Sequence, residues 1–494
     1  MHRTDMGEII TTRNDSDKPK LSRDESRNWR DELRILSKLC LPMVISQLAV
    51  IALSTTDVVL MGWLGKHQLA AGALGMQFYM PVFLFAMGII QAVATMIAQA
   101  IGANDARRLR QSLRQGFWVA IIATIPLSFL LWHGGFFLLL LGQEPQNADL
   151  ANGYLRTVMW GFLPWLLFIT MRGFMIAHSN IAPILIINLS GVLLNILGDY
   201  ALMFGNFGFP RMELIGAGIV SSVVSCFMCA SLLIYVARHR IYKDYELFKR
   251  FWRADWPLFF EIVRIGLPIG FTILAASGFF SVATLMVGTL GTTPLAAHAI
   301  AQQITFVVFM VPLAISHAST IRVALSAGAE DRHGVRRSGW TSIALGMGIT
   351  AAICLFILIA RVPLTMTFVD ASLATNAQVL DLAAKLLICA AVYEMFDGLV
   401  ILTSGPLRGL KDTRIPMIMA IVGYWVIGLA FCVVLGFTLE WGVMGIWIGM
   451  GIGLAVVALL NTWRFIWKSA IKSQVLSVQS SSSSSGKSRS VVVK

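Results

Sequence analysis

The 494-residue chain is 57% hydrophobic and only 13% charged, with a mean hydropathy of +0.74 and a formal net charge of +13. Soluble domains carry roughly 25% charged residues, so this composition excludes a soluble globular fold. The lysines and arginines gather in loops rather than along one helix face, which argues against a nucleic-acid-binding protein.

A charged segment precedes the apolar part of the chain. Residues 1–35 carry both charge signs and have no apolar core before Leu33, so we expect a cytoplasmic segment rather than a cleavable signal peptide. Beyond it, apolar stretches of about 20 residues recur, each long enough to cross a hydrocarbon core roughly 30 Å thick. The helices that we predict cover residues 36–64, 68–101, 115–142, 151–177, 181–205, 214–238, 259–289, 294–326, 338–360, 377–404, 415–437 and 441–467.

The loops between these helices alternate in charge. Every second loop is rich in Lys and Arg, as around Arg107, Lys243 and Arg336, whereas the intervening loops offer little beyond Lys66, Arg211 and Arg361. Short loops rich in Lys and Arg remain in the cytoplasm, so both termini are expected there. That orientation requires an even number of helices, and twelve satisfies it.

The chain contains an internal repeat. Aligning each residue n with n+226 pairs Pro42 with Pro268, and the segment from Gly102 to Asp105 with the segment from Gly328 to Asp331. Six helices per copy give both halves the same orientation. This is the parallel type of transporter repeat, whose interface is the usual place for a substrate cavity that opens alternately to each side. A channel or an enzyme needs no such architecture.

The repeat predicts an all-α membrane protein with twelve transmembrane helices in two six-helix bundles, related by a pseudo-twofold axis along the membrane normal. We place the N-terminal lobe at residues 36–238 and the C-terminal lobe at residues 259–468, joined by a cytoplasmic linker over 239–258. Residues 469–494 contain a serine run of low complexity, which cannot build a packed core and predicts a disordered tail.

Two acids lie inside predicted helices of the first half. Asp57 and Asp199 lie at matching depths below the outer ends of their helices, so their side chains can meet. A charge at the centre of a bilayer costs about 2.5 to 3.5 kcal/mol on insertion scales, so each acid needs a reason. Asn195 lies one helical turn before Asp199, on the same face. Two carboxylates in a low-dielectric site resist joint ionisation, which favours proton uptake near neutral pH. The alternative is a helix-packing hydrogen bond without titration, although Ala283, the repeat mate of Asp57, shows that the fold needs no acid there.

Four segments carry a resemblance to a known family. They are STTDVVLMGWLGKHQLAAGALG from Ser54, NLSGVLLNILGDYALMFGNFGFP from Asn188, LGTTPLAAHAIAQQ from Leu290, and YEMFDGLVILTSGPLRGLKDTRIP from Tyr393. With them, residues 33–470 resemble the multidrug and toxic compound extrusion (MATE) family, and more closely its NorM-like bacterial branch. The resemblance implies a secondary transporter that exports organic cations and other small amphipathic compounds by antiport with H+ or Na+, through alternating access between the lobes.

The resemblance also assigns the acids of the first half. Asp57, Asn195 and Asp199 match the family's N-lobe cation site one by one, which implies that they bind the coupling H+ or Na+. No other metal is expected. The family pattern further implies that the first helix bends near Pro42 when this site takes up a proton. Proline removes one backbone hydrogen bond of a helix, and neighbouring groups can satisfy the freed carbonyl.

A second group of polar residues lies on the tenth predicted helix. Tyr393 and Asp397 match the family's C-lobe cation site, and Glu394 lies three residues before Asp397 on the same side. The family's glutamate in the seventh helix falls on Ala276, which weakens the case for a sodium site that needs both acids. We expect Tyr393, Glu394 and Asp397 to form a substrate or second cation site, with Glu394 as the candidate replacement. A purely structural role for Asp397 is the alternative.

Two other functions are less consistent with the sequence than export. A flippase for lipid-linked sugars is expected to carry several cationic residues in its cavity, whereas the intramembrane charges here are mostly acidic. An intramembrane enzyme is disfavoured because His178, His298 and His317 form no HExxH pattern and no serine nucleophile motif is present. We expect no cofactor besides the coupling ion. The expected protein is a monomer in the bacterial cytoplasmic membrane, with membrane lipids and small cationic drugs as its partners.

Overall fold

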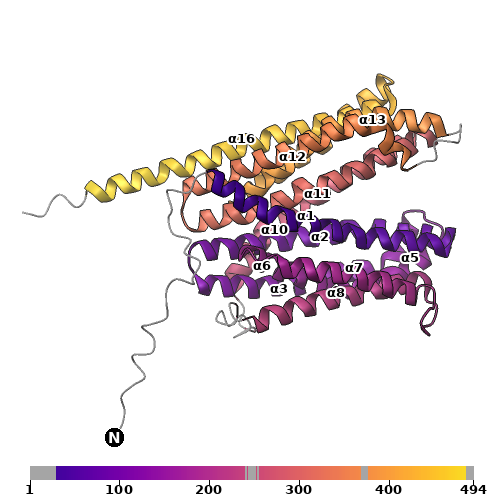
Figure 1. Ribbon diagram of the computed structural model, residues 1–494, viewed down its shortest axis with the longest axis horizontal. Coiled ribbons are helices and arrows are strands. Elements are labelled where there is room, and N and C mark those ends of the chain that lie inside the picture. Colours follow the sequence, from indigo (N-terminus) through magenta and orange to yellow (C-terminus); the bar gives the residue numbers. More distant parts are fainter. Residues whose placement is uncertain (1–28, 240–241, 243–251, 253–254, 369–375, 486–494) are drawn as a thin grey trace, which may run out of the picture.

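The computed structural model describes residues 29–239, 242, 252, 255–368 and 376–485 (Figure 1). These described residues form helices and turns without any β-strand. Twelve helical segments among them are long and apolar enough to cross a membrane. The predicted all-α fold with twelve spanning helices is confirmed.

The first six spans form the lower group of helices in Figure 1, coloured indigo to magenta. Their elements are α1 (Trp29–Leu64), α2 (Lys66–Gly102), α3 (Ala106–Trp132), the short α4 (Gly134–Leu140), α5 (Pro145–Val158), α6 (Phe162–Ala177), α7 (Ala182–Leu202) and α8 (Glu213–Arg238). A 3₁₀ turn at Met159–Gly161 joins α5 and α6 into one span. We call this group the N-lobe.

The last six spans, coloured from rose to yellow, form what we call the C-lobe; most of them lie in the upper group, and the first is labelled between the two groups, beside α2 (Figure 1). Its elements are α10 (Trp256–Gly288), α11 (Thr292–Gly328), α12 (Arg332–Met366), α13 (Ala377–Gly409), α14 (Arg414–Ile421), α15 (Leu429–Val433) and α16 (Gly442–Ser485). The π-helical segments η3 (Val422–Gly428) and η4 (Val434–Thr438) join α14 and α15 into a single span.

Several helix ends differ from the sequence prediction, and the third span covers Ala106–Trp132 instead of residues 115–142. The first helix begins at Trp29 instead of residue 36, and its first residues are mostly exposed apart from the buried Glu32. At the other end, α16 continues beyond its membrane span to Ser485, where the sequence predicts a disordered tail. Adding a residue to an existing helix gains one hydrogen bond without a new nucleation step, so an anchored helix can extend into a polar segment. Most of the predicted linker 239–258 lies outside the described residues.

The apolar cores show how the lobes are joined. One core contains residues of both lobes, and its C-lobe members, such as Ile321 and Leu325, lie at helix ends on the predicted cytoplasmic side. The outer half of the C-lobe has a separate core around Phe279. A third core, around Met61, belongs to the N-lobe alone. The lobes therefore share packing toward one side and diverge toward the other, as Figure 1 shows.

Glycines permit the closest approach between the lobes. A Cβ atom on Gly88 of α2 would lie 2.6 Å from the Cα atom of Gly270 on α10, so the two backbones are in direct contact. Near the ends of α2 and α11, a Cβ on Gly102 would collide with the carbonyl of Leu325, and a Cβ on Gly328 would collide with the carbonyl of Gln99 in the same way. Small residues at such crossings are typical of packed membrane helices.

Candidate functional site

The structure brings together the two acids predicted for the N-lobe. Asp57 on α1 is 7% exposed, and Asp199 on α7 is fully buried at 0%. Their carboxyl groups face each other within hydrogen-bonding reach. Asn195, one turn before Asp199, donates a hydrogen bond from Nδ2 to Oδ1 of Asp57 at 2.9 Å. The predicted triad is therefore a single contiguous group.

The two carboxyl groups differ in their hydrogen bonds. Asp57 also accepts a hydrogen bond from Oγ of Ser221 through Oδ2, at 3.4 Å. Neither carboxylate oxygen of Asp199 has a hydrogen-bond donor among the described residues. A buried carboxylate without donors is costly unless it is neutral or bound to a cation. One proton shared between Asp57 and Asp199, or one small cation held by their oxygens, would supply the missing interaction.

Two residues of this site have no counterpart in the sequence prediction. Ser221 comes from α8, whose span holds four serines, so the sequence alone does not single it out. Tyr154 comes from α5, is 3% exposed, and lies within electrostatic range of both acids. It falls near the start of a predicted span, where nothing in the sequence marks its orientation. The N-lobe site thus draws on four helices: α1, α5, α7 and α8.

Pro42 lies inside α1, which remains one continuous helix through this position. Beyond Pro42, the polar side chains of α1 bond to the N-lobe: Ser46 accepts a hydrogen bond from Asn188 on α7, and Gln47 accepts one from Arg172 on α6 at 3.2 Å. The same helix also packs against α11 and α12 of the C-lobe. Bending near Pro42 on proton uptake stays a prediction.

The acids predicted for the C-lobe form a second buried pair on α13. Glu394 and Asp397 are 1% and 6% exposed, and each lies within electrostatic range of the other. Oε2 of Glu394 has no hydrogen-bond partner in the described part of the chain. Ala276 packs against the C-lobe core, so the position of the missing family glutamate is apolar. The ring of Tyr393 contacts Phe280, with the ring centroids 6.2 Å apart.

A histidine near this pair is held by both ring nitrogens. The indole Nε1 of Trp447 lies 3.1 Å from Nδ1 of His298, and Oγ1 of Thr284 lies 3.0 Å from Nε2. An indole N–H can only donate, so Nδ1 accepts and the ring is neutral with its hydrogen on Nε2. Trp447 in turn packs edge-on against Tyr393, with the ring centroids 5.4 Å apart. His298 therefore fixes the indole of Trp447, which packs against Tyr393 next to the C-lobe acids.

Two lobes of six helices, each with a pair of buried acids, define a membrane transporter built on a parallel repeat. Buried ionisable groups within membrane helices mark ion or substrate pathways. Comparison with known proteins narrows this class.

The MatE family profile matches residues 42–201 and 268–434. The probable multidrug resistance protein NorM of Mesorhizobium japonicum is 41% identical over 445 residues, which cover 90% of this chain and 95% of that protein. The eukaryotic MATE transporter AtDTX14 shares the fold with a TM-score of 0.79 at 22% identity, over 89% of this chain and 96% of that one. A MATE protein solved in complex with MaD3S gives a TM-score of 0.81 at 19% identity, over 90% and 97% of the two chains. The chain belongs to the MatE family, whose members are transporters rather than enzymes, as the sequence predicted.

Proposed function

We propose that the chain is a multidrug efflux transporter that exports organic cations and other small amphipathic compounds in exchange for inward-moving protons, with Na+ as the alternative coupling ion. The observation that carries the proposal is the pair of Asp57 and Asp199, in which a fully buried carboxylate faces another and has no donor among the described residues. Binding one cation strongly lowers the free energy of such a buried pair of carboxylates.

Coupling requires that the ion and the drug favour different states of the protein. In this proposal, cation uptake by Asp57 and Asp199 favours the state that releases drug outside. Loss of the cation restores the state that binds drug. The second buried pair, Glu394 and Asp397, supplies negative charge for a cationic substrate in the C-lobe. The name of the Mesorhizobium relative, a probable multidrug resistance protein, supports drugs as the exported class.

A transport assay with separate ion gradients tests the proposal. Purified protein in liposomes should move ethidium against its gradient when a pH gradient is imposed, and an uncoupler should abolish this movement. Ethidium transport that follows a Na+ gradient alone would show that the coupling ion is Na+ rather than the proton. Absence of ethidium movement, and of movement of other cationic dyes, under both gradients would refute export by ion antiport.

We further propose the bacterial cytoplasmic membrane as the location, with both termini in the cytoplasm. The loops rich in Lys and Arg support this orientation. The start of α1 and the end of α16 lie on the same side in Figure 1, as an even number of spans requires. Alkaline phosphatase fused after α16 should be inactive in Escherichia coli, whereas activity would contradict a cytoplasmic C-terminus.

A further inference from the structure

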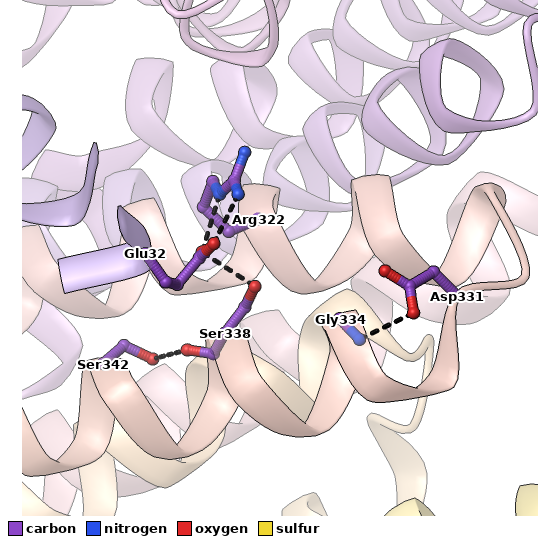
Figure 2. A network of polar contacts seen from close by, with 6 residues as sticks. All are labelled: Glu32, Arg322, Asp331, Gly334, Ser338 and Ser342. Carbon is purple, nitrogen blue, oxygen red and sulfur yellow. Dashed lines mark hydrogen bonds and ion pairs between the residues drawn. The ribbon is translucent and has the colours of Figure 1, made fainter. Parts of the chain in front are cut away.

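A buried ion pair joins the two lobes on the side where they share a core. Glu32, in the first turn of α1, is fully buried at 0% exposure. Its Oε1 accepts a hydrogen bond from Nε of Arg322 at 2.9 Å, and its Oε2 accepts one from Nη2 at 2.7 Å. Ser338 of α12 donates to Oε1 at 2.8 Å. Figure 2 shows the three side chains converging from α1, α11 and α12.

The geometry makes this contact strong and specific. Two parallel N–H···O bonds between a guanidinium and a carboxylate form the bidentate arrangement that gives charge-assisted pairs their strength. Arg322 is only 7% exposed, so solvent screens the pair little. Removing one partner of such a pair leaves an uncompensated charge in a buried place, which is strongly destabilising. The contact between the lobes at this point therefore depends on both charges.

The ion pair attaches the first part of α1 to the C-lobe. Before Pro42, Glu32 bonds to the C-lobe, whereas beyond Pro42 the side chains of Gln47 and Asp57 bond to the N-lobe. The helix that carries Asp57 is thus fixed to both lobes, with the proline between its two attachments. A rearrangement at the N-lobe acids is in this way mechanically connected to the C-lobe.

Other polar contacts between the lobes at this end lack either a second charge or burial. Nη1 of Arg408 donates to Oε1 of Gln91 at 2.7 Å, and the ion pair of Arg108 with Glu261 is exposed at 3.4 Å. Within the described residues, the pair of Glu32 and Arg322 is the interlobe ion pair in which both members are buried.

We propose that Glu32, Arg322 and Ser338 are positioning residues that lock the lobes together on the cytoplasmic side, and that this lock opens once in each transport cycle. The inference rests on the proposed alternating access. When the lobes separate on this side, water reaches both charged groups and replaces the hydrogen bonds that they lose. The lock is asymmetric, because the repeat mate of Glu32 is Leu258 and that of Arg322 is Met96.

The test measures the distance between the lobes in full-length protein in lipid nanodiscs. Spin labels on cysteines introduced at Asn104 and Glu330 report it, in a background without the six native cysteines. Both positions are exposed and lie at repeat-equivalent loops, one in each lobe. Glu32→Gln should raise the ratio of open to closed distances about tenfold or more, because Arg322 is left buried without an acid. The double variant Glu32→Gln with Arg322→Gln should lie closer to the wild type, because no unpaired charge remains.

Asp412→Asn is the matched control. It breaks the pair of Asp412 with Arg464, which is 2.8 Å long and largely buried but lies within the C-lobe, so the distance distribution should stay unchanged. If Glu32→Gln does not fold, Ser338→Ala removes one hydrogen bond from Glu32 and should give a smaller shift in the same direction. Wild-type distances for folded Glu32→Gln and Ser338→Ala would overturn the lock. Distances in the wild type that ignore both pH and ethidium would instead contradict alternating access itself.

Discussion

The pair of Asp57 and Asp199 makes a sharp prediction for Asp57→Asn. The substitution keeps the shape of the side chain and an acceptor oxygen for Nδ2 of Asn195, which now bonds at 2.9 Å. The new amide can also donate to Asp199, whose oxygens have no donor among the described residues. One of the two negative charges is lost, so the site keeps its packing but attracts a cation much less strongly.

The magnitude follows from the charges. Two unit charges about 4 Å apart repel by about 4 kcal/mol at an effective dielectric constant of about 20. That energy corresponds to about a thousandfold in cation affinity, because about 1.4 kcal/mol is tenfold. The free energy of unfolding should change by no more than about 1 kcal/mol, since one hydrogen bond is exchanged for another of similar worth.

Ethidium transport by proteoliposomes under an imposed pH gradient measures the effect. We expect the rate for Asp57→Asn to fall to that of empty liposomes, and thermal unfolding to stay near the wild type. Asp381→Asn is the control, because Asp381 is exposed on α13 and pairs with Lys385 one turn away; such surface pairs contribute about 0.5 kcal/mol. Wild-type transport by a well-expressed Asp57→Asn protein would refute the coupling role.

Three further predictions concern the C-lobe and the lobe contact. Asp397→Asn should raise the apparent KM for ethidium about tenfold, worth about 1.4 kcal/mol, and an unchanged KM would argue for a structural role. Gly88→Val should destabilise the protein by about 1 to 3 kcal/mol through overpacking, whereas Gly348→Val, where nothing lies within 4 Å of the added Cβ, should not; equal thermal unfolding of the two would contradict the close contact of α2 and α10. Trp447→Phe should cost about 1 to 3 kcal/mol, because it leaves Nδ1 of buried His298 without a donor, and unchanged thermal unfolding would show that the bond is not needed.

The sequence was sufficient to predict the twelve spans and the proximity of Asp57 to Asp199. Long apolar runs and matched depths carry that information directly, because a bilayer fixes the length and level of each helix. The rotation of each helix about its own axis could not be predicted in this way. Ser221 and Tyr154 join the site only because α8 and α5 turn these faces inward, and that rotation is set by packing against neighbours.

The lock shows a second limit of sequence reasoning. Glu32 stands in a charged segment that is expected to be solvated, and its partner lies 290 positions away. No local pattern links residues so far apart. Arg322 did carry a signal, since it lies inside the predicted span 294–326, where a lone arginine needs a partner. Which acid would reach it depended on how α1 crosses to the other lobe.

The affinity of the purified protein for ethidium, measured across pH at low and at high Na+, tests the central claim most directly. If drug and cation compete through Asp57 and Asp199, the wild-type affinity rises with pH by up to about tenfold per unit for one displaced proton, or falls with Na+ if that is the coupling ion. In Asp57→Asn the affinity should be independent of both. An equal response of wild type and Asp57→Asn to pH and to Na+ would place the coupling site elsewhere.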